Sequence, residues 1–203
     1  FLRRRDPEAV VQTIAQLCQT RLPKNMGIPA TEIQVLSPTR KGETGTKNLN
    51  LALQAVLNPP AAGKKEKRYG DFSFREGDRV MQIRNNYDIL WKNPNGLGAG
   101  TGIFNGDIGV IVQIDYEAEL VTVDFDDKLA EYAFDLLGEL EPAYAMTIHK
   151  SQGSEYRAVV LCLCGGPQML LTRSVLYTAI TRARELLIIV GNEDGVAAMT
   201  RND

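Results

Sequence analysis

Residues 143–155 read AYAMTIHKSQGSE, an apolar run that breaks into a cluster of polar, basic and flexible residues. The opening residues have the character of a buried strand, and the cluster after them is a loop suited to holding phosphates or sugars. Donors for anionic oxygens and an acceptor for a ribose hydroxyl follow one another within a short length of chain: Thr147, His149, Lys150, Gly153 and Glu155. A solvated loop between a strand and a helix is the alternative at this point.

A second segment downstream makes the loop far more specific. Residues 175–184 read VLYTAITRAR, and they are followed by the apolar strand LLIIVG at 186–191. The run TIHKSQGSE at 147–155 resembles motif V of superfamily 1 helicases, and YTAITRAR at 177–184 resembles their motif VI. The chain is most similar to the RecD-like branch of that superfamily.

Length and composition fit one globular core, or one core with a small satellite domain. The chain has 203 residues, of which 44% are apolar and 24% are charged. No apolar run approaches the roughly 18 residues of a membrane helix, and no signal segment opens the chain, so we expect no membrane partner. Because the chain begins at Phe1 without an initiator methionine, we expect it to be part of a longer protein.

The three cysteines indicate buried, reduced thiols. Cys162 and Cys164 alternate along an expected strand, and no further ligands stand at zinc-like spacing. We therefore expect no metal site and a cytoplasmic protein.

The net charge of -2 conceals a strong asymmetry along the chain. Residues 1–80 carry 14 Lys and Arg against 8 Asp and Glu, residues 81–141 carry 3 against 12, and residues 142–203 carry 6 against 5. A surface that follows DNA phosphates is therefore expected on the first and last segments and not over most of the middle one.

The beginning of the chain predicts helices packed on a parallel sheet. Asp6 is placed to cap a helix that begins at Pro7 and runs to about Leu22, before a turn-rich stretch from Pro23 to Ala30. A buried strand follows at residues 32–36, and then a second helix, which Thr46 or Asn48 is able to cap and which residues 58–60 (Asn-Pro-Pro) end. The end of the chain repeats this pattern, with buried strands at 158–163 and 186–190 and a helix of about 168–184 between them.

The middle of the chain predicts a small antiparallel β-barrel. Strand patterns alternate with Gly, Asn and Asp turns, at residues 77–84, 109–114 and 120–125. Residues 59–68 have the composition of a mobile linker, residues 115–119 that of a hairpin turn, and the glycine-rich middle of the loop 85–107 that of a disordered segment.

The resemblance implies an α/β fold, a RecA-like (P-loop NTPase-type) second motor domain carrying an inserted SH3-like antiparallel β-barrel. The motor domain is expected to be discontinuous, with segments 1–67 and 142–203. The inserted barrel is expected at 68–141.

The resemblance also assigns residues to a nucleotide. Superfamily 1 helicases bind ATP between two RecA-like domains, and Arg182 corresponds to the arginine finger, which holds phosphate oxygens with two donors. An arginine that only compensates a helix dipole is the alternative. Arg5 is the nearest match to a second arginine at the γ-phosphate, with Arg3 and Arg4 as competitors. Three motif V residues are expected to face the nucleotide: Gln152, Gly153 and Glu155.

A second group is assigned to single-stranded DNA. Motif V is expected to contribute Thr147, His149 and Lys150, and the run LSPTRKG at 36–42 resembles the RecD-like pattern in which Thr39 and Arg40 meet phosphates. Within the barrel, the resemblance points to Asn85, Asn86, Tyr87 and Asn105, where a tyrosine beside amides is able to stack on a base. Ordinary strand ends and an Asn-Gly turn are the alternatives for these last two groups.

The implied function is that of a 5′–3′ DNA helicase that couples ATP hydrolysis to translocation. No Gly-x-x-x-x-Gly-Lys-Ser/Thr run occurs in the chain, and the loop 42–47 is rejected as a P-loop. ATP and Mg²⁺ are therefore expected to bind mainly to a first motor domain outside this chain, so the chain alone is expected to be inactive. The alternatives are a non-catalytic module that binds single-stranded DNA or docks a protein, and the RecD (exodeoxyribonuclease V alpha) subunit of a nuclease complex.

Overall fold

The computed structural model describes residues 1–202, which form two compact units. The first unit joins Phe1–Leu57 to the segment that begins at Tyr144, and the second is Asn58–Ala143. The second unit thus begins at Asn58 rather than at residue 68. The Asn58 side chain is buried and donates to Asp78 Oδ1 at 2.7 Å, and the backbone carbonyl of Asn58 accepts from the Arg75 guanidinium.

Residues 59–68 are not the free linker that their composition suggested. Lys64 Nζ donates to Asn58 Oδ1 at 2.6 Å, and strand β3 (Glu66–Tyr69) pairs with β4 (Phe72–Arg75) as a separate hairpin. Prolines and lysines favour extension and solvation, but here the chain is held by hydrogen bonds that composition does not reveal.

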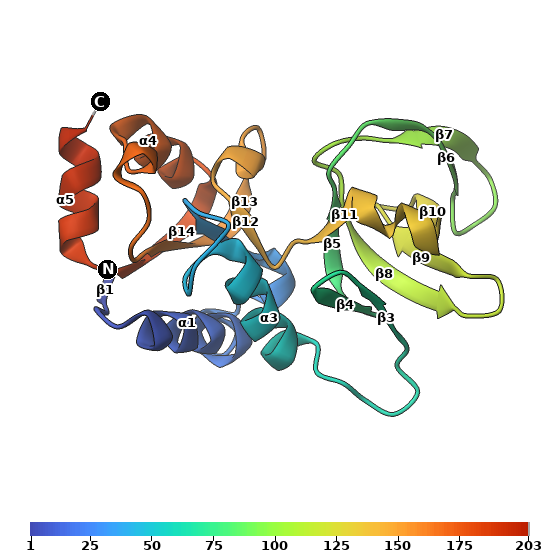
Figure 1. Ribbon diagram of the computed structural model, residues 1–203, viewed down its shortest axis with the longest axis horizontal. Coiled ribbons are helices and arrows are strands. Elements are labelled where there is room, and N and C mark those ends of the chain that lie inside the picture. The colour runs from blue at the N-terminus through green and yellow to red at the C-terminus, as the bar shows by residue number, and fades with distance from the viewer. Residues whose placement is uncertain (203) are drawn as a thin grey trace. The chain divides into compact units, whose positions relative to one another are not determined.

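The first unit is built on a five-stranded, fully parallel sheet (Figure 1). The strands, in their order across the sheet, are β1 (Leu2–Arg3), β14 (Ala183–Gly191), β13 (Tyr156–Leu163), β2 (Ile33–Ser37) and β12 (Ala145–Thr147). Every residue of β2 is buried, as is every residue of β13 from Ala158 onward. This burial on both faces matches the continuous apolar runs of the sequence and confirms the expected buried strands at 32–36 and 158–163. The run expected to be buried at 186–190 lies in β14, where Leu186–Ile189 are half-buried and Val190 is buried.

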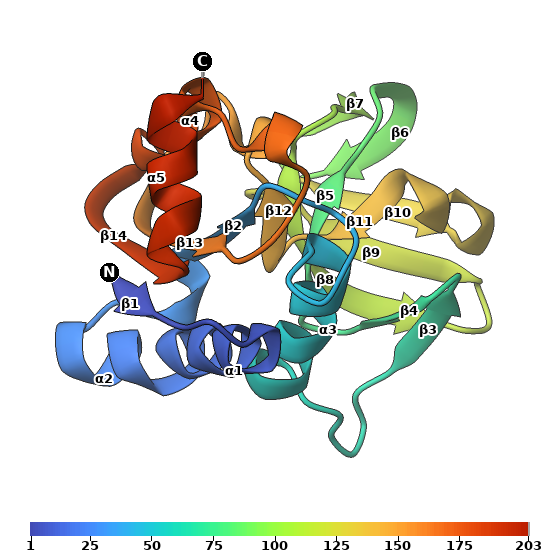
Figure 2. The same cartoon turned by 60° about the vertical axis from the view of Figure 1, so that its left-hand side comes forward.

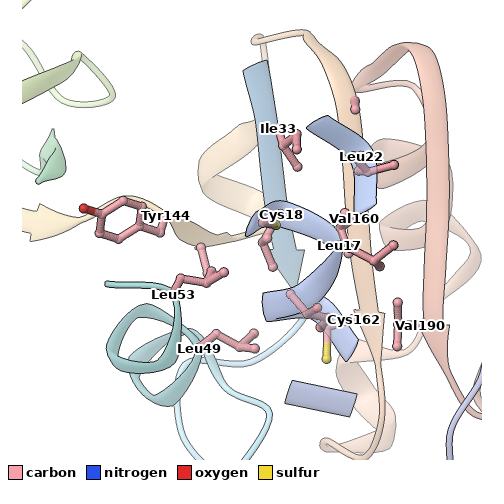
Figure 3. Packing of buried hydrophobic residues seen from close by; sticks show 14 of the residues in the cluster. Leu17, Cys18, Leu22, Ile33, Leu49, Leu53, Tyr144, Val160, Cys162 and Val190 are labelled. Atoms are coloured by element: carbon pink, nitrogen blue, oxygen red, sulfur yellow. The ribbon is translucent and has the colours of Figure 1, made fainter. Parts of the chain in front are cut away.

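Helices cover both faces of this sheet. They are α1 (Pro7–Gln16), α2 (Leu22–Met26), α3 (Thr46–Leu57), α4 (Arg173–Ile180) and α5 (Glu193–Arg201). The helices α1 and α3 lie on one side of the sheet, and α4 and α5 on the other (Figure 2). Figure 3 shows the core beneath α1 and α3, where Leu49 and Leu53 join Val160 and Val190 of the central strands. The RecA-like α/β layering inferred from the sequence is confirmed.

The first helix begins where the sequence places it but ends later. Asp6 caps it by accepting from Ala9 N–H at 2.9 Å, and Pro7 is its first residue. The expected end near Leu22 is wrong, because a π-helical turn at Leu17–Arg21 carries the helix into α2 as far as Gly27, whose φ is +63°. The wider π turn takes the backbone past a proline that would otherwise clash with the preceding turn.

The helix before β14 is shorter than its apolar spacing suggested. It was expected over about 168–184, but Thr172 caps α4 and the helix ends at Ile180. Ala183, which fits the helical spacing, instead pairs with Tyr156 as the first residue of β14. Strand pairing with β13 determines the end of the helix, and that pairing has no signature within the helix sequence.

The cysteines are free thiols. Burial raises the pKa of Cys18 and of Cys162 to about 12, so both remain protonated at neutral pH. Cys164 is only partly buried.

The second unit contains a seven-stranded antiparallel sheet that curves into a half-barrel, in agreement with the expected SH3-like fold. Its strands, in order across the sheet, are β11 (Leu140–Pro142), β5 (Arg79–Gln82), β8 (Ile108–Asp115), β9 (Leu120–Asp124), β10 (Leu129–Ala133), β6 (Asn86–Lys92) and β7 (Ala99–Ile103). A separate apolar core fills it, with Phe74, Ile111, Ile114 and Tyr132 among its buried residues. The expected turn between β8 and β9 is confirmed.

The expectation of disorder in the glycine-rich loop 85–107 is wrong. Its two halves pair as β6 and β7, and Gly100 lies opposite Trp91. A Cβ at Gly100 would stand 2.5 Å from Cζ2 of Trp91, so glycine is required there for the indole to pack on the backbone. Glycines that indicate flexibility in the sequence thus serve close packing in the fold.

Within residues 1–202, no helix is long and apolar enough to cross a membrane.

Candidate nucleotide and DNA site

Two predicted groups of residues meet at the carboxyl edge of the parallel sheet. Thr147 ends β12 directly opposite Ser37, the last residue of β2, and Ile148 N–H donates to the Ser37 carbonyl at 3.2 Å. Thr39 and Arg40 follow β2, so they lie at the same edge as Thr147. Carboxyl ends of parallel strands are where such sheets bind their ligands.

The residues after Thr147 form a tight turn that presents basic groups to solvent. His149–Ser151 is a single 3₁₀ turn, and the buried Ser151 hydroxyl donates to the Ile148 carbonyl at 2.6 Å. His149 is exposed and Lys150 is half-buried. The apolar and hydroxyl residues of the turn therefore anchor it from below, while the imidazole faces outward.

The same segment then runs to the opposite edge of the sheet. Because β12 and β13 are both parallel to β2, the chain must return from the carboxyl edge to the amino edge before β13 begins at Tyr156. Gln152, Gly153 and Glu155 are exposed along the second half of this return, and Gly153 has a φ of +87°. We call residues 148–155 the crossing segment.

Arg182 lies where the crossing segment ends. Its carbonyl accepts from Tyr156 N–H at 2.8 Å, and its Nη1 donates to the Ser154 carbonyl at 2.9 Å. The structure therefore brings together the runs 147–155 and 177–184, which more than twenty residues separate in the sequence. Gly153 and Glu155, on either side of Ser154, are brought beside the guanidinium.

The guanidinium is held by three acceptors and keeps further donors. Nε donates to the Thr178 carbonyl at 3.2 Å, Nη2 donates to Thr181 Oγ1 at 3.2 Å, and Nη1 uses the Ser154 carbonyl. Three of the five N–H donors of an arginine are thereby used, and one remains on each Nη. Two donors on neighbouring nitrogens suit two oxygens of one phosphate. The bond to the Thr178 carbonyl also caps the end of α4, so Arg182 has the helix-end role as well.

Arg5 does not join Arg182. β1 pairs with the far end of β14, with Arg3 opposite Gly191, whereas Arg182 precedes the first residue of β14. Nine residues of strand separate the two edges by about 25 Å. Arg5 therefore lies at the carboxyl edge. Arg3 pairs with Glu193 and Arg4 donates to Thr13 Oγ1 at 3.0 Å, while Arg5 has no side-chain partner within residues 1–202.

In the second unit, the structure gathers the predicted barrel residues around an exposed aromatic pair. Asn85 Oδ1 accepts from Asn105 N–H at 3.0 Å, which ties the two ends of the β6–β7 hairpin together. Beside this bond, Tyr87 and Phe104 meet edge to face with ring centroids 5.5 Å apart. Tyr87 is 67% exposed and Phe104 is 40% exposed, so both rings are accessible.

Asn86 has a different position from its neighbours. Its Nδ2 donates to Glu139 Oε2 at 3.0 Å and its Oδ1 accepts from Asp88 N–H. Glu139 also accepts from Gln82, and Gln82 in turn accepts from the buried Tyr132 hydroxyl at 2.8 Å. Both polar ends of Asn86 are therefore engaged in anchoring the strand that carries Tyr87.

Three contributors were absent from the sequence-based site: Phe104, Ser154 and Thr181. Phe104 precedes the Asn-Gly turn, and its aromatic character beside Asn105 was the signal that would have found it. Ser154 acts through its backbone carbonyl, which no sequence pattern marks.

Among residues 1–202, no group of three or more His, Cys, Asp or Glu side chains is arranged to hold a metal ion.

Two family descriptions match the chain. Residues 49–125 match the SH3 domain of ATP-dependent RecD-like DNA helicases, and residues 142–190 match the UvrD-like helicase C-terminal domain. The fold is similar to that of the Bacteroides Pif1 helicase solved in complex with ADP-AlF3 and ssDNA, with a TM-score of 0.50 and 17% identity over 93% of this chain and 46% of that chain.

Curated relatives agree with these matches. The chain is 36% identical over 169 residues to the ATP-dependent RecD2 DNA helicase of Deinococcus radiodurans, covering 83% of this chain and 21% of that protein. It is 39% identical over 172 residues to the RecBCD enzyme subunit RecD of Mycobacterium tuberculosis, covering 82% of this chain and 26% of that protein. The chain thus spans about a fifth to a quarter of these relatives. By its two matched domains and its relatives, the chain belongs to the RecD-like family of superfamily 1 DNA helicases.

Proposed function

We propose that this chain is the second motor domain, with its inserted barrel, of an ATP-dependent DNA helicase that moves 5′ to 3′ on single-stranded DNA. The crossing segment carries the proposal, because it connects basic and hydroxyl groups at one edge of the sheet to the Arg182 guanidinium at the other. A motor that couples hydrolysis to movement needs such a connection between its two ligands. The polarity rests on family resemblance alone.

The nucleotide half of the proposed site is Arg182 with Gln152, Gly153 and Glu155. Arg182 would hold γ-phosphate oxygens with the two donors that the fold leaves available. ATP and Mg²⁺ would bind mainly to the first motor domain, which supplies the P-loop and the magnesium-binding carboxylate. Arg5 stays outside this group, because it lies at the other edge of the sheet.

The DNA half of the proposed site lies at the carboxyl edge. Thr39, Arg40, Thr147, His149 and Lys150 would contact phosphates, with the imidazole acting by hydrogen bonding. In the barrel, Tyr87, Asn85 and Asn105 would contact the strand, and Asn86 would support them through Glu139. The Pif1 structure with ADP-AlF3 and ssDNA shows a protein of similar fold with both kinds of ligand.

The setting of the parent protein has two alternatives. One relative is a RecD2 helicase, and another is a subunit of the RecBCD enzyme. The parent would therefore be either a free-standing helicase, which works with its own first motor domain, or a helicase subunit of a nuclease complex. The upstream sequence of the parent would decide between these two alternatives. The three free cysteines support a cytoplasmic location.

The proposal predicts a clear division of activity between the parent and this chain. With ATP and Mg²⁺, the full-length parent should unwind a duplex that has a 5′ single-stranded tail and leave a 3′-tailed duplex paired. The 203-residue chain should hydrolyse no ATP with or without DNA, because it contains no P-loop. Circular dichroism of the chain is the control for folding. DNA-stimulated hydrolysis by the chain, or unwinding from a 3′ tail, would contradict the proposal.

A second candidate function follows from the exposed aromatic pair. Tyr87 and Phe104 could make the barrel a non-catalytic module that binds single-stranded DNA by stacking, with the motor motifs serving only as scaffold. Both functions use DNA, but they differ in which residues determine affinity.

Binding of the chain to an oligonucleotide over a salt titration separates the two candidates. If the motor proposal holds, Thr147→Val with His149→Ala should weaken binding, and Tyr87→Ala should cost a further ~1–3 kcal/mol, the usual value of one stacked base. Leu90→Ala is the matched control, since Leu90 is 70% exposed on the same strand as Tyr87 but outside the cluster. Unchanged affinity in the Thr147 and His149 variant, with binding abolished by Tyr87→Ala, would favour the barrel module.

A further inference from the structure

Thr181 lies between the Arg182 guanidinium and the end of α4. Its Oγ1 accepts from Arg182 Nη2 at 3.2 Å and lies 3.0 Å from both the Tyr177 and Thr178 carbonyl oxygens. A hydroxyl has one proton, so it donates to one of these carbonyls while it accepts from the arginine. The hydroxyl is thus fixed by the helix end and fixes the guanidinium in turn.

Thr181 is the one side chain among the three acceptors of the guanidinium. The Thr178 and Ser154 acceptors are backbone carbonyls, which belong to the end of α4 and to the crossing segment. An arginine has many rotamers, and a group that stabilises developing charge is most effective when it is already held in place before the reaction. The three bonds restrict the guanidinium at Nε, Nη1 and Nη2 and leave one donor on each Nη.

We propose that Thr181 is a positioning residue for the arginine finger. This inference rests on the proposed function of Arg182. The hydroxyl occupies one N–H of Nη2 and so orients the remaining N–H of Nη1 and Nη2 toward one phosphate. Without it, Nη2 would lose the one acceptor that it has among the described residues, and the guanidinium would be free to rotate about the bonds to the Thr178 and Ser154 carbonyls. In this role Thr181 acts through Arg182.

The competing explanation is that Thr181 only caps α4. A cap affects the stability of the helix, whereas a positioning residue affects turnover through Arg182 and through nothing else. The two roles are separated by substitutions that remove or keep the hydroxyl and by the dependence of the effect on Arg182.

The test is DNA-stimulated ATP hydrolysis by the full-length parent, with single-stranded DNA in excess. Thr181→Val should lower kcat about 3- to 10-fold with KM unchanged, which is the usual net value of one hydrogen bond that is partly exposed to solvent. Thr181→Ser keeps the hydroxyl and should restore kcat. Thr20→Val is the matched control, because the Thr20 hydroxyl makes the same kind of bond, to the Gln16 carbonyl at 3.1 Å, in a helix far along the chain from Arg182. It should leave kcat unchanged.

A double variant completes the experiment. In an Arg182→Ala background, Thr181→Val should cause no further loss, because the group that it positions is gone. Thermal melting of each variant is recorded alongside, and Thr181→Ala replaces Thr181→Val if the latter does not fold.

Two results would overturn the inference in distinguishable ways. If Arg182→Ala itself retains wild-type turnover, the proposed function of Arg182 fails, and the role of Thr181 fails with it. If Arg182→Ala loses turnover but Thr181→Val matches wild type, or lowers kcat equally in the Arg182→Ala background, only the positioning role fails.

Discussion

Replacing Arg182 with alanine in the full-length parent should reduce DNA-stimulated ATP hydrolysis by about a thousandfold or more, the lower range measured for arginine fingers. In the proposed role, Arg182 offers two donors on neighbouring nitrogens to the transferring phosphate, and the substitution would remove both where charge develops. DNA affinity should be nearly unchanged, because Arg182 lies at the amino edge of the sheet and the DNA group at the carboxyl edge. Steady-state hydrolysis and an equilibrium binding titration measure the two effects on one preparation.

Two further variants sharpen this result. Arg182→Lys keeps the charge but not the paired donors, so it should recover little of the lost rate. Arg184→Ala is the matched control, since Arg184 is an exposed arginine two residues further along the same segment. Hydrolysis by Arg182→Ala within tenfold of wild type, or an equal loss in Arg184→Ala, would refute the finger assignment.

The second large effect is expected at Gly191, where three strands meet. Gly191 ends β14 with a φ of +150°, and a Cβ there would stand 2.0 Å from the Leu163 carbonyl oxygen of β13. The Gly191 carbonyl also accepts from Arg4 N–H at 2.9 Å, which holds β1 to the sheet. Gly191→Ala should therefore destabilise the first unit by about 3 kcal/mol or more, since the clash is with backbone and no side chain can move aside.

A neighbouring glycine provides the control. A Cβ at Gly195, inside α5, would stand 3.7 Å from the same Leu163 oxygen, which is ordinary contact. Gly195→Ala should stabilise the chain by about 0.5–1 kcal/mol, because alanine loses less backbone entropy in a helix. Urea unfolding followed by circular dichroism compares the two variants, and equal midpoints would show that neither backbone argument holds.

Much of the fold was predictable from local rules. The Asp6 cap, the buried strands of the parallel sheet and the antiparallel strands β5, β8 and β9 follow from capping chemistry and from the period of the apolar residues. The failures share a physical cause. Pro23 favours the end of a helix, but a π turn carries the helix past it. Gly100 favours a flexible loop, but the Trp91 indole packs against it. Ala183 favours a helix, but it pairs with β13 as a strand residue.

The candidate site was predictable to a similar degree. Thr39 and Thr147 share an edge because carboxyl ends of neighbouring parallel strands always do, and the sequence contains that information. The bond from Arg182 to the Ser154 carbonyl depends on the register between β13 and β14, which no single segment encodes. The position of Arg5 depends likewise on where β1 pairs with β14. Its resemblance to a γ-phosphate arginine therefore could not predict how far it lies from Arg182.

The crossing segment has one mechanical consequence, which concerns its length. Thr147 and Tyr156 are fixed in strands on either side of β2, and the register places them about 22 Å apart, given the usual rise along strands and spacing between them. The residues between them, three of which form a 3₁₀ turn, reach at most about 26 Å. Such a tether has almost no slack. If the proposed function holds, a displacement of its His149 end would therefore be passed on to Ser154. Inserting a few flexible residues into the segment would then uncouple the two ends while leaving both proposed ligand groups intact.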